Sequence, residues 1–276
     1  QSFFLATSPS LIPMKRVEQQ NDWIETWKDV HSYDLMEIYG QVKWRGHAYA
    51  YDIRRRNVFE LIKKVVKPGA KILDVAAAQG NFALPLAEMG YDVTWNDLRA
   101  ELIDYVKLKY ESGTVQYVPG DVFSLGFDSC FDLVLIAEII EHVAHPDDFL
   151  KKVSQLVKPG GYIVMTTPNG EYFRNTLPKF SECADPSQFE SIQFAPNSDG
   201  HIFLLHLDEV DQLARLSIVE TRLFVNPLTN GHIKLENALK VMPRPWVEQI
   251  EGFTESLPWG IQRKLHKGMA VLMQRV

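Results

Sequence analysis

The stretch AKILDVAAAQGNFALPLAEMGYDVTWND, residues 70–97, decides the fold of this chain. Its apolar residues 71–75 predict a buried strand, and residues 81–89 predict a helix that ends at Gly90. Residues 91–95 predict a second strand. A strand, a turn of small residues, a helix and another strand make a βαβ unit, in which the two strands pair in parallel.

The alternation of strands and helices continues along the chain. Further strands are predicted at residues 115–118, 131–137, 162–166, 219–225 and 269–274, and further helices at residues 47–66, 98–110, 146–157 and 207–216. Strands that are apolar throughout are typical of a sheet covered on both faces. We therefore expect an α/β fold: a doubly wound, Rossmann-like, mainly parallel seven-stranded sheet with an antiparallel last strand and a helical cap.

The polar, irregular stretches between these elements predict how the chain is divided. We expect an N-terminal helical cap segment, a cofactor-binding core in three pieces and two insertions that form an acceptor cap. Their ranges are 1–66 for the cap segment, 67–168, 201–225 and 267–276 for the core, and 169–200 and 226–266 for the insertions.

Composition narrows the function classes. The 276 residues are 46% hydrophobic, as in a globular core, and the formal net charge of −6 gives no general attraction for nucleic acid. The two cysteines, Cys130 and Cys183, have no metal-like spacing and favour a reducing cytoplasm. No apolar run reaches the roughly 20 residues of a membrane span, and the first residues read poorly as a signal peptide. The oligomeric state stays open.

The turn after the first strand carries the chemistry of a nucleotide site. Asp74 stands near the end of the strand, small residues follow to Gly80, and the next helix offers free N–H groups. Asp97, about 20 residues on, ends the second strand, where an acid binds both ribose hydroxyls. An acid at Asp74 would repel a pyrophosphate but suits an ammonium group. This favours S-adenosylmethionine over NAD.

On these residues, the segment from Lys71 to Leu216 resembles the class I S-adenosylmethionine-dependent methyltransferases. Their first motif usually reads D-x-G-x-G-x-G; here Ala76 and Ala78 replace the first two glycines, and we expect negative φ at both. The resemblance implies that Asp97 holds the ribose, Leu98 packs on the adenine and Asp121 reaches the adenine amine. The full expected cofactor set is Asp74, Ala76, Ala78, Gly80, Asn81, Phe82, Asp97, Leu98, Asp121, Val122 and Ala137.

The fourth strand runs into Glu138, Glu141 and His142, and His201 follows later. This pattern resembles two branches of the superfamily. One is the O-methyltransferases of ubiquinone biosynthesis and glycan pathways, with motifs such as EHV-x-x-P and TPN. The other is the small-RNA 2′-O-methyltransferases, in which two Glu and two His hold a divalent metal. That second resemblance implies Glu138, Glu141, His142 and His201 as ligands of Mg²⁺ or Mn²⁺.

A metal-free site is the other interpretation of the same residues. His142 would then be the general base, because its ordinary pKa lies near neutrality, with Glu138 and Glu141 beside it in the catalytic set. Aromatic and basic residues ahead of the core, with two later polar ones, are candidates for binding the acceptor, although the former also fit a solvated basic helix face. The expected substrate-binding set is Trp44, Arg45, Tyr49, Tyr51, Arg54, Asn169 and Arg174.

The sequence thus predicts an S-adenosylmethionine-dependent methyltransferase that acts on a hydroxyl of a small polar or sugar-containing acceptor. We expect Phe173, Phe180, Phe189, Phe194 and Trp246 of the insertions to supply apolar walls for it. Two alternatives stay open. One is metal-dependent 2′-O-methylation of an RNA 3′ end, and the other is a non-catalytic interaction protein that keeps the cofactor fold.

Overall fold

The computed structural model describes residues 14–39, 45–193, 200–214, 216–229 and 233–276. Trp44 of the expected substrate set and Phe194 of the expected apolar walls lie outside these residues. Within the described residues, no helix has the length and apolar character needed to cross a bilayer.

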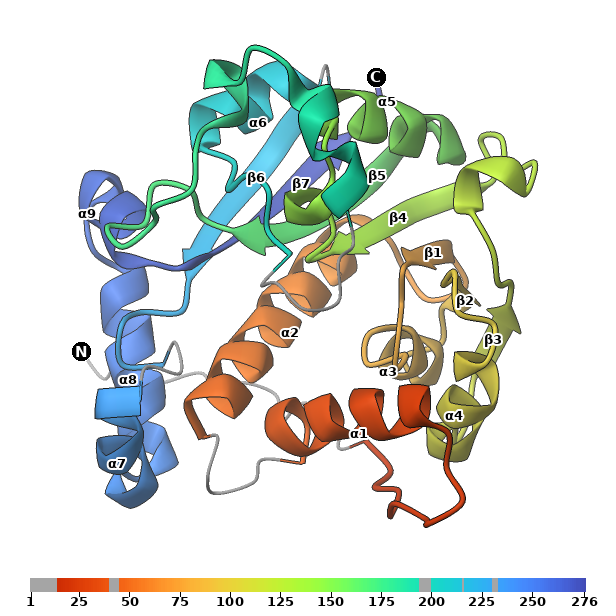
Figure 1. Ribbon diagram of the computed structural model, residues 1–276, viewed down its shortest axis with the longest axis horizontal. Helices are drawn as coiled ribbons and strands as arrows, with labels where there is room; N and C mark the ends of the chain where they lie inside the picture. The colour runs from red at the N-terminus through yellow and green to blue at the C-terminus, as the bar shows by residue number, and fades with distance from the viewer. Residues whose placement is uncertain (1–13, 40–44, 194–199, 215, 230–232) are drawn as a thin grey trace.

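The described strands form one seven-stranded sheet in the order β3-β2-β1-β4-β5-β7-β6 (Figure 1). β1 pairs in parallel with β2 and β4, whereas β7 is antiparallel to both of its neighbours, β5 and β6. The expected doubly wound, Rossmann-like sheet with an antiparallel last strand is confirmed. The strand bounds are β1 (Lys71–Val75), β2 (Asp92–Trp95), β3 (Thr114–Tyr117), β4 (Phe131–Ala137), β5 (Val157–Pro168), β6 (Ser217–Phe224) and β7 (Gly268–Gln274).

Helices cover both faces of the sheet. In Figure 1, α2 crosses one face of the sheet, and α5 and α6 lie toward the top of the view. The buried clusters place α5 and α6 on the face of the sheet opposite α2. The described helices are α1 (Glu25–Glu37), α2 (Arg45–Val65), α3 (Ala83–Glu88), α4 (Leu102–Lys109), α5 (Pro146–Leu156), α6 (Leu207–Ala214), α7 (Ile233–Val241), α8 (Arg244–Glu255) and α9 (Trp259–Leu265). Short 3₁₀ turns, η2 to η5, occupy Val122–Ser124, Ile140–His142, Phe180–Glu182 and Pro186–Ile192.

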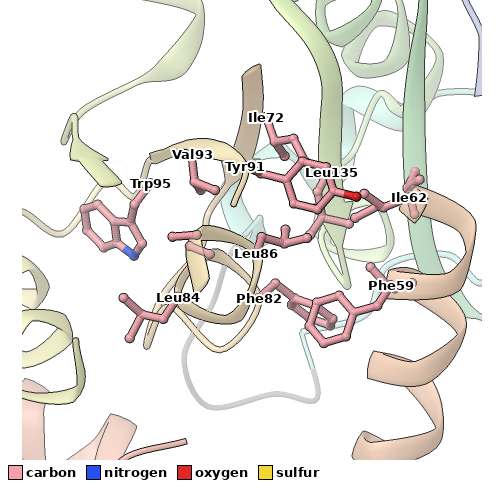
Figure 2. Close-up of a cluster of buried hydrophobic side chains, with 14 of the residues drawn as sticks. Phe59, Ile62, Ile72, Phe82, Leu84, Leu86, Tyr91, Val93, Trp95 and Leu135 are labelled. Atoms are coloured by element: carbon pink, nitrogen blue, oxygen red, sulfur yellow. The ribbon is translucent and has the colours of Figure 1, made fainter. Parts of the chain in front are cut away.

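The central strands β1, β4, β5 and β7 are apolar because they contribute side chains to a core on both faces. Ile72 and Leu135 join the cluster under α2 and α3, while their neighbours Leu73 and Val134 join the cluster under α5. Figure 2 shows the first cluster, in which aromatic rings from α2 and the turn before α3 meet side chains from β1, β2 and β4. The rings of Phe59 and Phe82 pack edge to face at 5.8 Å. This cluster fixes α2 and α3 beside the carboxyl ends of the strands.

The elements outside the sheet differ in part from the prediction. β5 begins at Val157, earlier than the predicted residue 162. The 169–200 segment contains only two 3₁₀ turns among its described residues, whereas α7, α8 and α9 occupy most of 226–266. The division into cap segment, core and insertions stays a prediction.

A buried polar network attaches α1 to the core. One carboxylate oxygen of Asp34 accepts hydrogen bonds from Lys109 Nζ and from the Tyr105 hydroxyl, both at 2.6 Å. The other oxygen accepts from Asn81 Nδ2 at 2.7 Å, and Lys109 Nζ also donates to Asn81 Oδ1 at 2.6 Å. The side chains of Asp34 and Lys109 are fully buried. A pair removed from water in this way keeps its position because its remaining donors and acceptors are also bonded.

We predict that Lys109→Met lowers the free energy of unfolding by about 3–5 kcal/mol, because it leaves the Asp34 carboxylate buried without a counter-charge. Lys107→Met, on the same helix, is the matched control. Its exposed ion pair with Asp104 should contribute less than about 1 kcal/mol. Urea denaturation followed by circular dichroism measures both variants; equal losses in the two would contradict the role given to the buried pair.

Candidate functional site

The loop after β1 is tightly bent and contradicts one expectation. Ala76 and Ala78 have φ of +51° and +44°, not the negative values that we expected. Three contacts hold the loop against the end of β2: Ala77 N–H donates to the Asn96 carbonyl, Ala78 N–H donates to Asp97, and Trp95 Nε1 donates to the Ala78 carbonyl. Each alanine in this region costs roughly 1–2 kcal/mol, so the contacts must impose the bend. The motif therefore keeps the glycine conformation without the glycines.

Gly80, the third motif position, has a packing role. Its φ is +73°, and a Cβ there would lie 2.8 Å from Cγ1 of Val106 on α4. Glycine thus lets α4 approach the start of the α3 turn closely.

Asp74 is a buried acid with one oxygen unsatisfied. The residue is 2% exposed, and its Oδ2 has no hydrogen-bond partner among the described residues. Burial raises the pKa of Asp74 to about 8, and the negative charge of Asp97 adds to the rise, whereas a hydrogen bond from the Ala83 backbone opposes it. An unpaired buried carboxyl oxygen at this point fits a ligand that brings a positive charge or a donor.

Asp97 ends β2 and is engaged by its neighbour. Arg99 donates to both carboxylate oxygens, from Nε at 2.9 Å and from Nη2 at 3.1 Å. The arginine side chain is 45% exposed, so it is free to move, whereas Asp97 is buried. A ribose diol would use the same two oxygens, and the assignment of Asp97 to ribose stays a prediction. Arg99 was not predicted from the sequence as a partner of Asp97, although it lies only two residues after it.

A cavity of about 330 Å³ lies in front of this loop, and we call it the strand-end cavity. Of the expected cofactor residues it is lined by Asp74, Ala76, Ala78, Asn81, Phe82 and Ala137. The remaining lining comes from Ala77, Gln79, Arg99 and Glu138 and from the cap helices, through Val30, Tyr33, Glu37, Tyr51 and Arg54. The contribution of α1 was not expected from the sequence.

Five residues of the expected cofactor set lie outside the lining of this cavity: Gly80, Asp97, Leu98, Asp121 and Val122. Leu98 is 67% exposed. Asp121 caps the η2 turn, where it accepts from Phe123 N at 3.1 Å and from Ser124 Oγ at 2.7 Å. Val122 is buried in the cluster under α5. The cofactor contacts of these residues stay predictions.

The end of β4 separates Glu138 from the other expected metal ligands. Glu138 has a φ of +55°, and its carboxylate forms an ion pair with Arg54 of α2, with Oε2 of Glu138 2.9 Å from Nη2 of Arg54. Glu138 does not belong to the group formed by Glu141, His142 and His201. The possible metal-ligand atoms of these three residues lie within 4.8 Å of one another. Glu138 is therefore set apart from the expected four-residue set by its ion pair with Arg54, and metal binding by the other three residues stays a prediction.

Glu141 is the buried centre of that group of three. Its Oε2 accepts from the Thr167 hydroxyl at 3.1 Å, while Oε1 has no hydrogen-bond partner in the part of the chain that the structure describes and lies 3.9 Å from His201 Nε2. The rings of His142 and His201 pack at 4.9 Å between centroids. Burial raises the pKa of Glu141 well above its ordinary value, and the negative charge of Glu138 raises it further. Such a group suits a proton or a cation.

A second, smaller cavity of about 80 Å³ adjoins the first, and we call it the inner cavity. It shares four lining residues with the strand-end cavity: Glu37, Tyr51, Arg54 and Glu138. The rest of its lining is His47, Ala50, Pro168, Phe224, Val225, Lys267 and Gly268. Charged and polar groups thus line this space beside apolar ones, and four residues separate it from the strand-end cavity.

The expected substrate residues are divided by the structure. Tyr51 and Arg54 line both cavities, whereas Arg45 and Tyr49 line neither. Asn169 is fully buried and has a structural role, because its amide donates to the Arg263 and His266 carbonyls. Arg174 lies over the ring of Phe173 instead of lining a cavity.

The apolar walls expected from the insertions are absent from both cavities, as far as the described residues go. Phe180 and Phe189 pack on Phe203 in a separate small cluster. Phe173 and Trp246 are exposed, at 56% and 62%. The cap helices α1 and α2 supply the walls instead.

Comparison with known proteins agrees with this geometry. Residues 73–165 match the family model of a methyltransferase domain. Over 174 residues the chain is 28% identical to a mitochondrial ubiquinone biosynthesis O-methyltransferase of Schizosaccharomyces pombe, covering 60% of each chain. Over 105 residues it is 37% identical to a ubiquinone biosynthesis O-methyltransferase of Pectobacterium atrosepticum, covering 37% of this chain and 44% of that one. Alignments with these and similar relatives span between 42 and 64% of the relatives' length.

Solved structures share the fold at low identity. A candidate sarcosine dimethylglycine methyltransferase of Galdieria sulphuraria superposes with a TM-score of 0.54 at 14% identity, covering 91% of this chain and 98% of that one. The cyclase SpnF superposes with a TM-score of 0.52 at 14% identity, covering 86% and 83%. The fold, the motif loop and the match of residues 73–165 to a methyltransferase domain together support a class I S-adenosylmethionine-dependent methyltransferase.

The raised pKa of Asp74 predicts a proton release on cofactor binding. Near pH 7 the free protein holds Asp74 mostly protonated, and pairing with the ligand ammonium favours the ionised form, so S-adenosylhomocysteine should displace close to one proton. Titration calorimetry in two buffers of different ionisation enthalpy measures that number. Asp74→Asn should abolish the release and weaken binding by about ten- to a hundredfold. The exposed Asp104→Asn is the control; an unchanged release in Asp74→Asn would assign the proton elsewhere.

Proposed function

We propose that this protein transfers the methyl group of S-adenosylmethionine to a hydroxyl oxygen of a small polar or sugar-containing acceptor. The observation that carries the proposal is the pair of adjoining cavities. One is lined by the motif loop and by the ends of β1 and β4, the other by both polar and apolar side chains, and four residues line both. A two-substrate reaction needs such a junction, because the reacting atoms must meet there.

The residues of the strand-end cavity fit the cofactor. Asp74 would accept the ammonium group with its unsatisfied oxygen, and Asp97 would accept the ribose hydroxyls once Arg99 moves aside. When bound, S-adenosylmethionine supplies an electrophilic methyl group.

The residues of the inner cavity fit a hydroxylated acceptor. Tyr51 offers a ring face to a sugar or an aromatic ring, and the Arg54 guanidinium offers donors to oxygen. The cavity is small, so it would admit the reacting ring and leave the rest of the acceptor outside. The relatives named as O-methyltransferases support oxygen as the methylated atom.

The test is a direct contest between acceptor classes. Wild-type protein is incubated with methyl-labelled cofactor and a panel of catechols, hydroxybenzoates, nucleotide sugars, glycolipids and short RNA duplexes. We expect label in a hydroxylated small molecule and less than about a hundredth of that rate in Asp97→Ala, which loses a bidentate cofactor contact. Label confined to the terminal ribose of RNA, with steep salt dependence, would overturn the proposal.

A second candidate is a metal-dependent reaction of the type that methylates an RNA 3′ end. The observation that favours it is the group Glu141, His142 and His201, whose donors lie close together around an unsatisfied buried oxygen. These residues would hold a divalent cation, which would supply Lewis-acid binding of substrate oxygens. The net charge of −6 argues against RNA as the acceptor.

Metal content and activity separate the two candidates. If the group holds a metal, protein dialysed against Mn²⁺ should retain about one ion per chain, and His201→Ala should retain none. Activity on the best panel compound should then vanish with EDTA and return with Mn²⁺. The matched control is His145→Ala, whose ring contacts Glu190 at the surface. Full activity after exhaustive chelation would reject the metal-dependent candidate.

A further inference from the structure

Glu37 occupies the junction between the two cavities. It is the last residue of α1, and its side chain lines both spaces. The residue is partly exposed, and it contributes to the lining of both cavities. A carboxylate at this position lies where the methyl group of the cofactor and the hydroxyl of the acceptor would meet.

The charged surroundings of Glu37 come from four elements and the segment before β7. Arg54 is held between α1 and β4 by its ion pair with Glu138. Burial raises the pKa of Glu37 to about 7; Asp34 and Glu138 add to the rise, and Arg54 and Lys109 oppose it. The titratable and charged groups around it are Asp34 of α1, His47, Tyr51 and Arg54 of α2, Lys109 of α4, Glu138 after β4 and Lys267 before β7.

We propose that Glu37 is the general base of the transfer, a role that rests on the proposed function. The Glu37 carboxylate takes the proton of the acceptor hydroxyl. The oxygen–methyl bond forms as the methyl–sulfur bond breaks, and the electron pair of the broken bond returns to sulfur, which becomes a neutral thioether. Glu37 then returns its proton to solvent. A base of this kind works best when its pKa lies near the working pH.

The other candidates at the junction are less suited to this role. Burial raises the pKa of Tyr51, which keeps its hydroxyl protonated, and a guanidinium such as Arg54 does not act as a base. Glu138 is already engaged by Arg54. His142, which the sequence favoured as the base, lines neither cavity and packs against His201. Of the four residues that line both cavities, Glu37 is the one left to accept the proton.

The pH dependence of cofactor binding tests the position of Glu37 without an acceptor. S-adenosylmethionine and S-adenosylhomocysteine carry the same ammonium, ribose and adenine, so the ratio of their affinities isolates the positive charge at sulfur. A carboxylate beside that charge favours the first ligand only when it is ionised. With a pKa of about 7 in the free protein, the ratio should rise about tenfold from about pH 5.5 to about pH 8 and then level off.

Glu37→Gln should make this ratio independent of pH and leave S-adenosylhomocysteine affinity within about threefold of wild type, which also shows that the variant folds. Glu25→Gln, an exposed position on the same helix, should behave as wild type. A flat ratio in wild type, or a rise that persists in Glu37→Gln, would overturn the proposal.

Turnover tests the proton transfer itself. On the panel compound that wild type methylates fastest, Glu37→Gln should lower kcat by about 10²- to 10⁴-fold and remove the acidic limb of the pH profile, with little change in KM for the cofactor. A wild-type kcat in Glu37→Gln would reject the general base. A wild type that binds both ligands but labels no panel compound would instead reject the proposed acceptor, while the affinity ratio would still decide the position of Glu37.

Discussion

The carboxylate of Asp34 is the contact on which the geometry of the site depends. It binds Lys109 and Tyr105 of α4 and Asn81 of the motif loop, so one side chain joins three elements that are distant in the sequence. Residues three or four apart share a helix face, so burying Asp34 also turns Val30 and Glu37 toward the strand ends. Helix α1 thereby becomes a wall of the cavity. A buried pair adds little net stability compared with apolar packing, but it fixes one orientation.

The motif loop and the end of β4 show how the sheet fixes the site beyond the preferences of individual residues. Ala76, Ala78 and Glu138 all have positive φ, and all lie at the carboxyl edge of the central strands. At Ala76 and Ala78, backbone and indole hydrogen bonds to β2 impose the bend, and at Glu138 the N–H donates to the Thr166 carbonyl of β5. Strain of this kind collects where a chain must present backbone or side chain to a ligand.

Local patterns predicted the sheet well because each strand is a short apolar run between turn residues, as in residues 71–75 and 131–137. They also placed Asp74, Ala76 and Ala78 at the cavity, because position after a strand is a local property. The conformation of the alanines, the place of Glu37 in both cavity linings and the ion pair of Glu138 with Arg54 were missed, since these depend on partners far along the chain. Asp34 and Lys109 are 75 residues apart, and no spacing rule links them. Distant contacts of this kind decide which side chains line the cavities.

The strand order determines when the last part of the sheet can form during synthesis of the chain. β7 follows β6 in the chain, yet it lies between β5 and β6 and pairs with both. While the ribosome is still adding residues 226–267, β6 therefore lacks the strand with which it pairs. Strands β1 to β5 can pair as they are made, whereas the final part of the sheet waits for residues 268–274. A premature stop between β6 and β7 would leave β6 unpaired and the β5 edge of the sheet open, and unpaired strands and open edges promote association with other chains.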